Sequence, residues 1–235
     1  MDIYKLLDNI LNNTALIQPE DIPNINLYMD QVTTFMDNHL HSIKRFDEDK
    51  SLTKTMINNY AKNDLLPSPE KKKYSKDHIL LLTFIYYYKN VLSISDIKKL
   101  LQPITDEYFH ATSGTTLSDV YSEIDSFLDS VGNCVTADIK QKLEIANASF
   151  REKSGKEADY LKLFSLISML CFDIYIKKQL VESIVDTLDE PISKSEKEKL
   201  EKKEHEEREK LAKKEREERE KQLRKERDQR EKFKK

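Results

Sequence analysis

The chain of 235 residues contains no tryptophan, only three glycines and only two cysteines. So few glycines argue against a loop-rich β fold and against glycine-rich phosphate-binding loops, because both need backbone conformations that other residues adopt poorly. Cys134 and Cys171 are too few for a disulfide framework or a zinc knuckle. We expect both to be small buried apolar groups.

The sequence also lacks the features of an exported or membrane protein. Its first residues, MDIYKLLDNI, have neither the basic start nor the apolar core of a signal peptide. The most apolar segments, Ile79 to Tyr88 and Leu163 to Phe172, are too short to span a bilayer. We therefore expect a cytoplasmic protein that makes no membrane contact.

Charge is abundant, at 35% of all residues, but unevenly distributed. The segment from Pro191 to Lys235 contains 19 Lys/Arg and 14 Asp/Glu. This tail therefore carries a net charge of +5, and the 190 residues before it carry −8, which together give the −3 of the whole chain. The first 190 residues are apolar enough to bury a core of their own.

The remaining composition, rich in Lys, Glu, Leu and Ile, predicts an all-α protein. Thr53 and Ser75 are predicted N-caps, and Pro103 is predicted to end a helix, with a loop over residues 105–116. The apolar middle of the last helix, LFSLISMLCF, suits the centre of a bundle. Apolar periodicity predicts helices over residues 3–12, 27–40 or slightly beyond, 54–63, 76–89, 93 or 95 to 100 or 101, 117–131, 136–153 and 156–188.

The tail has a different character. Its large apolar side chains lie 10 to 12 residues apart, which is too sparse for a coiled-coil seam. Glu-to-Lys or Glu-to-Arg pairs at i, i+4 are dense instead, as in Glu198–Lys202 and Glu215–Arg219. This pattern predicts a long charged single helix in solvent, and the alternative is a frayed tail. The chain thus divides into an N-terminal helix and linker (1–24), a head (25–103), a helical bundle for dimerisation or effector binding (104–190) and the charged helix (191–235).

The head is the most informative segment. From Asp49 to Gln102 it holds ten lysines and five acidic residues, and such a basic patch gives sequence-independent affinity for DNA by releasing counterions. On the predicted helix 54–63, asparagine side chains suit adenine, and lysines suit phosphates or guanine. A lysine cluster follows as a predicted wing. The candidate DNA-binding residues are Lys54, Thr55, Asn58, Asn59, Lys62, Lys71, Lys72, Lys73 and Tyr74.

Three successive segments carry a resemblance: Met56 to Pro67 (MINNYAKNDLLP), Lys71 to Ser75 (KKKYS) and Ser93 to Leu101 (SISDIKKLL). Their order resembles the MerR-type winged helix-turn-helix head, which implies a recognition helix, a wing and a helical hairpin. Asn58 and Lys72 stand where that family has arginines, and Asp64 stands where it has a helix-ending glycine.

A second resemblance adds LYMDQVTTF to these segments. Over residues 20–185 the chain looks like an uncharacterised domain-of-unknown-function family of Gram-positive bacteria. That family implies the same head and a helical C-terminal half, and no known activity.

Other candidate sites have simpler interpretations. Tyr86 to Tyr88 point to different sides of a helix, so we expect them in core and boundary packing and not as a base-stacking platform. Tyr60 and Tyr74 are also expected to be core rings that fasten helix to wing. The five histidines form no pattern of metal ligands, and no catalytic or dinucleotide-binding motif stands out. We expect neither an enzyme nor a bound cofactor or metal.

These features favour a transcriptional regulator that binds double-stranded DNA through the recognition helix and the lysine wing. A homodimer is expected, since such heads usually recognise two half-sites. The alternative is a protein-interaction adaptor whose charged tail acts as a spacer and offers a surface to a protein partner.

Overall fold

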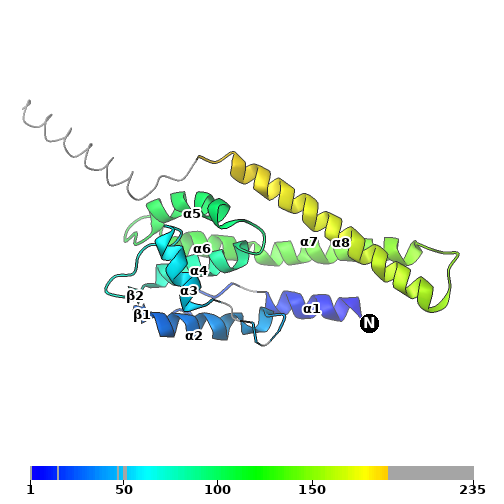
Figure 1. Cartoon of the computed structure of the whole chain (residues 1–235), viewed down its shortest axis with the longest axis horizontal. Helices are drawn as coiled ribbons and strands as arrows, with labels where there is room; N and C mark the ends of the chain where they lie inside the picture. The colour runs from blue at the N-terminus through cyan, green and yellow to red at the C-terminus, as the bar shows by residue number, and fades with distance from the viewer. Residues whose placement is uncertain (1, 15, 47, 50–51, 190–235) are drawn as a thin grey trace, which may run out of the picture. The chain divides into compact units, whose positions relative to one another are not determined.

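The computed structural model describes residues 2–14, 16–46, 48–49 and 52–189, and these belong to one compact unit (Figure 1). The predicted charged helix over 191–235 lies outside the described residues. Within them the expected all-α class is confirmed, since the two strands are only two residues long. The elements are α1 (Ile3–Asn13), β1 (Leu27–Tyr28), α2 (Met29–Leu40), the 3-10 turn η1 (His41–Ile43), α3 (Lys54–Lys62), β2 (Lys73–Tyr74), α4 (Lys76–Tyr88), α5 (Ile94–Tyr108), α6 (Leu117–Ser126), α7 (Leu128–Ala148) and α8 (Gly155–Asp186).

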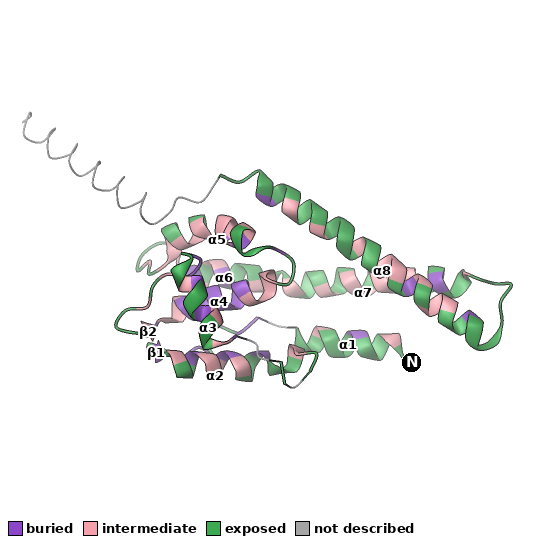
Figure 2. Ribbon diagram, viewed as in Figure 1, coloured by how far each residue is buried: buried purple, intermediate pink, exposed green. Residues whose placement is uncertain are grey.

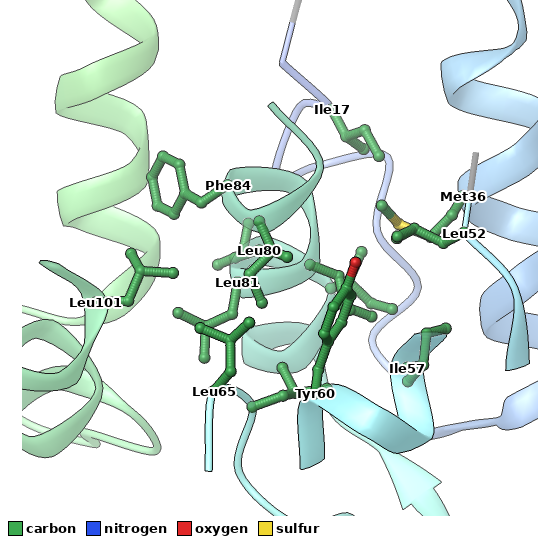
Figure 3. Packing of buried hydrophobic residues seen from close by; sticks show 14 of the residues in the cluster. Ile17, Met36, Leu52, Ile57, Tyr60, Leu65, Leu80, Leu81, Phe84 and Leu101 are labelled. Atoms are coloured by element: carbon green, nitrogen blue, oxygen red, sulfur yellow. The ribbon is translucent and has the colours of Figure 1, made fainter. Parts of the chain in front are cut away.

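Helix α4 forms the centre of the core. Every residue from His78 to Ile85 is buried, so this helix is covered on all sides, as a helix without a polar face requires. Its neighbours are α2, α6 and β2. Figure 3 shows Leu80 and Phe84 of α4 packed among core side chains from several other segments. Each such buried side chain contributes about 1.5–3 kcal/mol relative to exposure.

The same core extends beyond residue 103. Leu117 and Tyr121 of α6 are fully buried in it, and the ring of Tyr121 lies 5.0 Å from the ring of Phe84. Helix α6 therefore packs with the head and not only with the helices that follow it.

The start of the second helix differs from the expectation. Leu27 and Tyr28 form β1, which pairs antiparallel with β2 in the register Leu27↔Tyr74 and Tyr28↔Lys73. The helix begins at Met29. The prediction placed Leu27 in the helix because the local apolar pattern is helical, and it could not include a partner strand 46 residues away.

Helix α5 runs through Pro103 to Tyr108, so the predicted end at this proline is wrong. A proline inside a helix costs about 3 kcal/mol, because it removes a hydrogen bond and crowds the preceding turn. Ile104 and Tyr108 pack against the core, and this burial offsets the cost. Residues 109–116 form the loop.

The predicted break after Val131 is also absent. Helix α7 is continuous from Leu128 through Gly132 to Ala148, and α6 ends earlier, at Ser126. A Cβ at Gly132 would lie 3.7 Å from the side chain of Leu11 on α1, which is an ordinary van der Waals contact. Packing against α1 therefore does not explain this glycine, which costs a helix up to about 1 kcal/mol.

The apolar middle of α8 does not lie at the centre of a bundle within the single chain. Only Ala158, Leu166 and Val185 of α8 are buried, and Figure 2 shows exposed residues along most of this helix. Cys134 on α7 and Cys171 on α8 are exposed too, so the expectation that they are buried is wrong. An apolar pattern indicates that a helix needs apolar neighbours, but not that its own chain supplies them.

Candidate nucleic-acid interface

Helix α3 presents a polar face to solvent. Thr53 caps it as expected: its hydroxyl accepts a hydrogen bond from the backbone N–H of Met56 at 3.2 Å. Ile57 and Tyr60 are buried and fix the orientation of the helix. The five residues singled out on this helix, Lys54, Thr55, Asn58, Asn59 and Lys62, are all exposed.

The end of α3 is a tight C-cap. Asp64 has a left-handed backbone conformation, with φ of 55°. The N–H of Leu65 donates to the carbonyl of Tyr60 at 2.9 Å, and the N–H of Asp64 donates to that of Ala61 at 3.4 Å. This is the Schellman pattern, in which glycine is the usual residue at the left-handed position. Leu65 and Leu66 then enter the core.

The lysine cluster forms a two-residue turn. The N–H of Lys73 donates to the carbonyl of Glu70 at 2.8 Å, and the two residues between them, Lys71 and Lys72, have φ of 48° and 65°. Two positive φ values define a type I′ turn, which prefers Asn-Gly. Both lysines are exposed, so the turn holds two cationic side chains at its tip in a conformation that L residues seldom adopt.

The base of this turn is anchored in the fold. Lys73 is half-buried, and its ammonium lies 5.1 Å from the ring centroid of Tyr28 on β1. Tyr74 is buried, with 3% of its surface exposed. Its place among the candidate DNA-binding residues is therefore corrected: Tyr74 is a core ring that fastens the turn to α4, the other role that the sequence indicated.

A buried histidine joins the turn to α4. Ser75 caps α4, and its backbone N–H donates to Nδ1 of His78 at 3.0 Å. The ring of His78 meets the edge of Tyr74 at 5.3 Å and that of Phe109 at 4.9 Å. Burial lowers the pKa of His78 to about 4, and the neighbouring His110 acts in the same direction against the backbone carbonyls of Pro67 and Ser68. His78 is therefore neutral at pH 7 and accepts the capping hydrogen bond.

The lysines differ in their surroundings. Lys54 forms an ion pair with Asp30 of α2, and Asp64 lies 3.9 Å from Lys98. Within the described ranges, Lys62, Lys71 and Lys72 form no ion pair, so their charges remain available to a polyanion.

Several features of the site could not be predicted from sequence patterns. The pairing of β1 with β2 depends on contacts far along the chain, the left-handed lysines lack the Asn-Gly pair that signals such a turn, and His78 looked isolated. Tyr86, Tyr87 and Tyr88 pack partly buried against the core, as expected. Among the described residues no cluster of His, Cys, Asp and Glu could hold a metal ion, and no helix is both long and apolar enough to cross a membrane.

The fold and the site define an all-α domain with a two-stranded sheet at the base of a basic turn. Residues 17–124 match a family model described as Domain of unknown function (DUF1836). The match covers slightly less than half of the chain and runs from just before β1 to α6, the elements that share the core around α4. It is shorter than the expected resemblance over 20–185. No curated protein and no solved structure matches the chain.

Proposed function

We propose that this protein is a DNA-binding transcriptional regulator, not an enzyme, whose segment from β1 to α5 is a MerR-like winged helix-turn-helix. The observation that carries the proposal is the pair of exposed lysines at the strained tip of the turn after α3. Left-handed residues other than glycine cost roughly 1–2 kcal/mol each. Such strain is concentrated at functional positions, and a backbone turn alone would be better served by Asn-Gly.

Two further observations support the winged form of the proposal. The resemblance places a helix-ending glycine at position 64, and Asp64 has the left-handed conformation that such a glycine would have. The β1–β2 pairing attaches the turn beside the start of α2, so helix, turn and wing are held as one rigid unit.

In this proposal α3 is the recognition helix. Asn58 and Asn59 are exposed amides that suit the edge of adenine, and Lys62, Lys71 and Lys72 neutralise phosphates. The regulator acts as a cytoplasmic homodimer on two half-sites, as such heads usually do.

The direct test is an electrophoretic mobility shift with genomic DNA fragments at rising salt. The native protein is expected to shift DNA at low salt. Lys71→Glu/Lys72→Glu is expected to weaken binding. It should also flatten the plot of log affinity against log salt concentration by roughly two units of slope per chain, since each phosphate contact contributes about 0.9. Lys5→Glu/Lys140→Glu makes the same change of charge at two other exposed positions and is the matched control. No shift at low salt, or equal effects of the two double variants, would contradict the proposal.

A protein-interaction adaptor is the second candidate. Its supporting observation is the tail over 191–235, whose density of charge a DNA-binding head does not require. A protein partner that copurifies without nucleic acid, together with a negative mobility shift, would favour the adaptor.

A further inference from the structure

Helix α8 exposes a continuous apolar surface. Six of its large side chains, Tyr160, Phe164, Ile167, Phe172, Ile174 and Ile176, have between 49 and 69% of their surface exposed. Tyr160, Phe164, Ile167 and Ile174 follow the spacing 4, 3, 7, so they lie on one stripe of the helix. Phe172 and Ile176 lie on another side, so apolar groups face solvent in more than one direction.

Helix α7 covers only part of α8. The two helices are in contact through Lys142 and Asp173, 3.5 Å apart, and Ser149, the residue just after α7, has its hydroxyl 3.3 Å from that of Ser165. Helix α5 also contacts α8. A helix that is apolar on nearly all sides belongs at the centre of a bundle, and α7 and α5 together leave most large side chains of α8 exposed.

We propose that a second copy of this chain covers α8, and that the two α7–α8 hairpins form a four-helix bundle about a two-fold axis. This proposal names the interface of the homodimer in the proposed function, and the interface does not require DNA binding. The α8 helices contact each other across the axis, and each keeps its own α7 behind it.

The size of the surface fits a dimer. A large side chain that becomes fully buried removes roughly 150–250 Å² from water. The six side chains named above are 49 to 69% exposed, so they offer roughly 700 Å² per chain. Stable protein interfaces bury about 800 Å² per partner, so the apolar surface of α8 is comparable in size to one side of a stable dimer interface.

The chemistry of the surface fits an identical partner. No charged residue occurs from Leu163 to Phe172, and a two-fold interface must be complementary to itself, which an uncharged apolar strip satisfies without any counter-charge. The tail over 191–235 does not offer a matching apolar strip in its sequence, because its large apolar residues are only Ile192, Leu200, Leu211, Leu223 and Phe233.

The mass of the full chain in solution tests the proposal. The native protein is expected at about twice the 27.7 kDa of one chain at micromolar concentrations. Ile174→Glu places one carboxylate from each chain in the interface and is expected to weaken the dimer affinity by roughly 100-fold or more. Ile25→Glu is the matched control, because Ile25 and Ile174 are 67 and 65% exposed, and it should leave the dimer intact.

Circular dichroism checks that a monomeric Ile174→Glu variant is still folded. We expect that it is, because Ile174 is exposed within one chain. A native protein that is monomeric overturns the proposal, as does a dimer that persists in both Ile174→Glu and Ile176→Glu. A stable dimer that fails to shift DNA would refute the proposed function and leave this interface intact.

Discussion

At the scale of single residues, five described residues other than glycine occupy backbone conformations that favour glycine: Asp64, Lys71, Lys72, His110 and Phe150. Asp64 ends a helix, and its carboxylate lies 3.9 Å from Lys98, so it has a structural use. Lys71 and Lys72 form no ion pair among the described residues, and under the proposed function their strained turn presents two charges to DNA.

Replacing the two turn lysines by Asn-Gly should separate stability from binding. Lys71→Asn/Lys72→Gly relieves both strained conformations, and we expect the free energy of unfolding to rise by about 1–2 kcal/mol. The same variant should lose DNA affinity, because two phosphate contacts disappear. Urea unfolding and the mobility shift measure the two effects. Lys71→Glu/Lys72→Glu keeps the strain, so a gain in stability there would contradict this explanation.

At the scale of elements, the start of α4 is where the turn, the helix cap and the core meet. The neutral ring of His78 accepts the capping hydrogen bond from Ser75 and is surrounded by Tyr74 and Phe109. A proton on Nδ1 would remove this acceptor and place a charge in the core. Local helix geometry and the wing therefore depend on the protonation of one histidine.

Stability should therefore fall below neutral pH. The unfolded chain binds a proton at His78 below pH 6.5, whereas the folded chain resists protonation until about pH 4. The contribution of His78 is present above pH 6.5 and is lost as the pH falls towards 4, by roughly 3 kcal/mol in total. Urea unfolding across this range measures it. His78→Gln keeps an acceptor at the same capping position and should flatten this part of the profile; an unchanged slope would assign the pH dependence to other groups.

Elements also show where local pattern and tertiary structure disagree. The caps at Thr53 and Ser75 were predictable because a cap is formed by residues three apart. The sequence left two possible starts for α5, Ser93 and Ser95. In the structure Ser93 is the cap, and its backbone N–H donates to the carboxylate of Asp96 at 3.1 Å.

At the scale of the whole molecule, the proposed function and the proposed dimer have a joint consequence. A dimer contacts DNA with two heads, so a monomeric Ile174→Glu variant should bind DNA more weakly, and its salt dependence should have about half the slope of the native protein. Fluorescence anisotropy with a labelled DNA fragment at several salt concentrations measures both. Equal slopes for dimer and monomer would show that one head suffices, and would leave the interface on α8 unaffected.

The sequence alone was enough for the all-α class, the caps at Thr53 and Ser75, the burial of Tyr60 on α3 and the apolar character of α4 and α8. Each of these depends on residues within one or two helical turns, so their spacing contains the information. The β1–β2 pairing and the course of α5 through Pro103 depend on partners distant in the chain, and only the tertiary structure decided them. The left-handed lysines form a local turn, but it was not predictable because such turns prefer Asn-Gly. The exposure of α8 was also decided only by the tertiary structure. Its apolar pattern predicts an apolar environment, and the folded chain shows that the other helices of the same chain do not bury most of it.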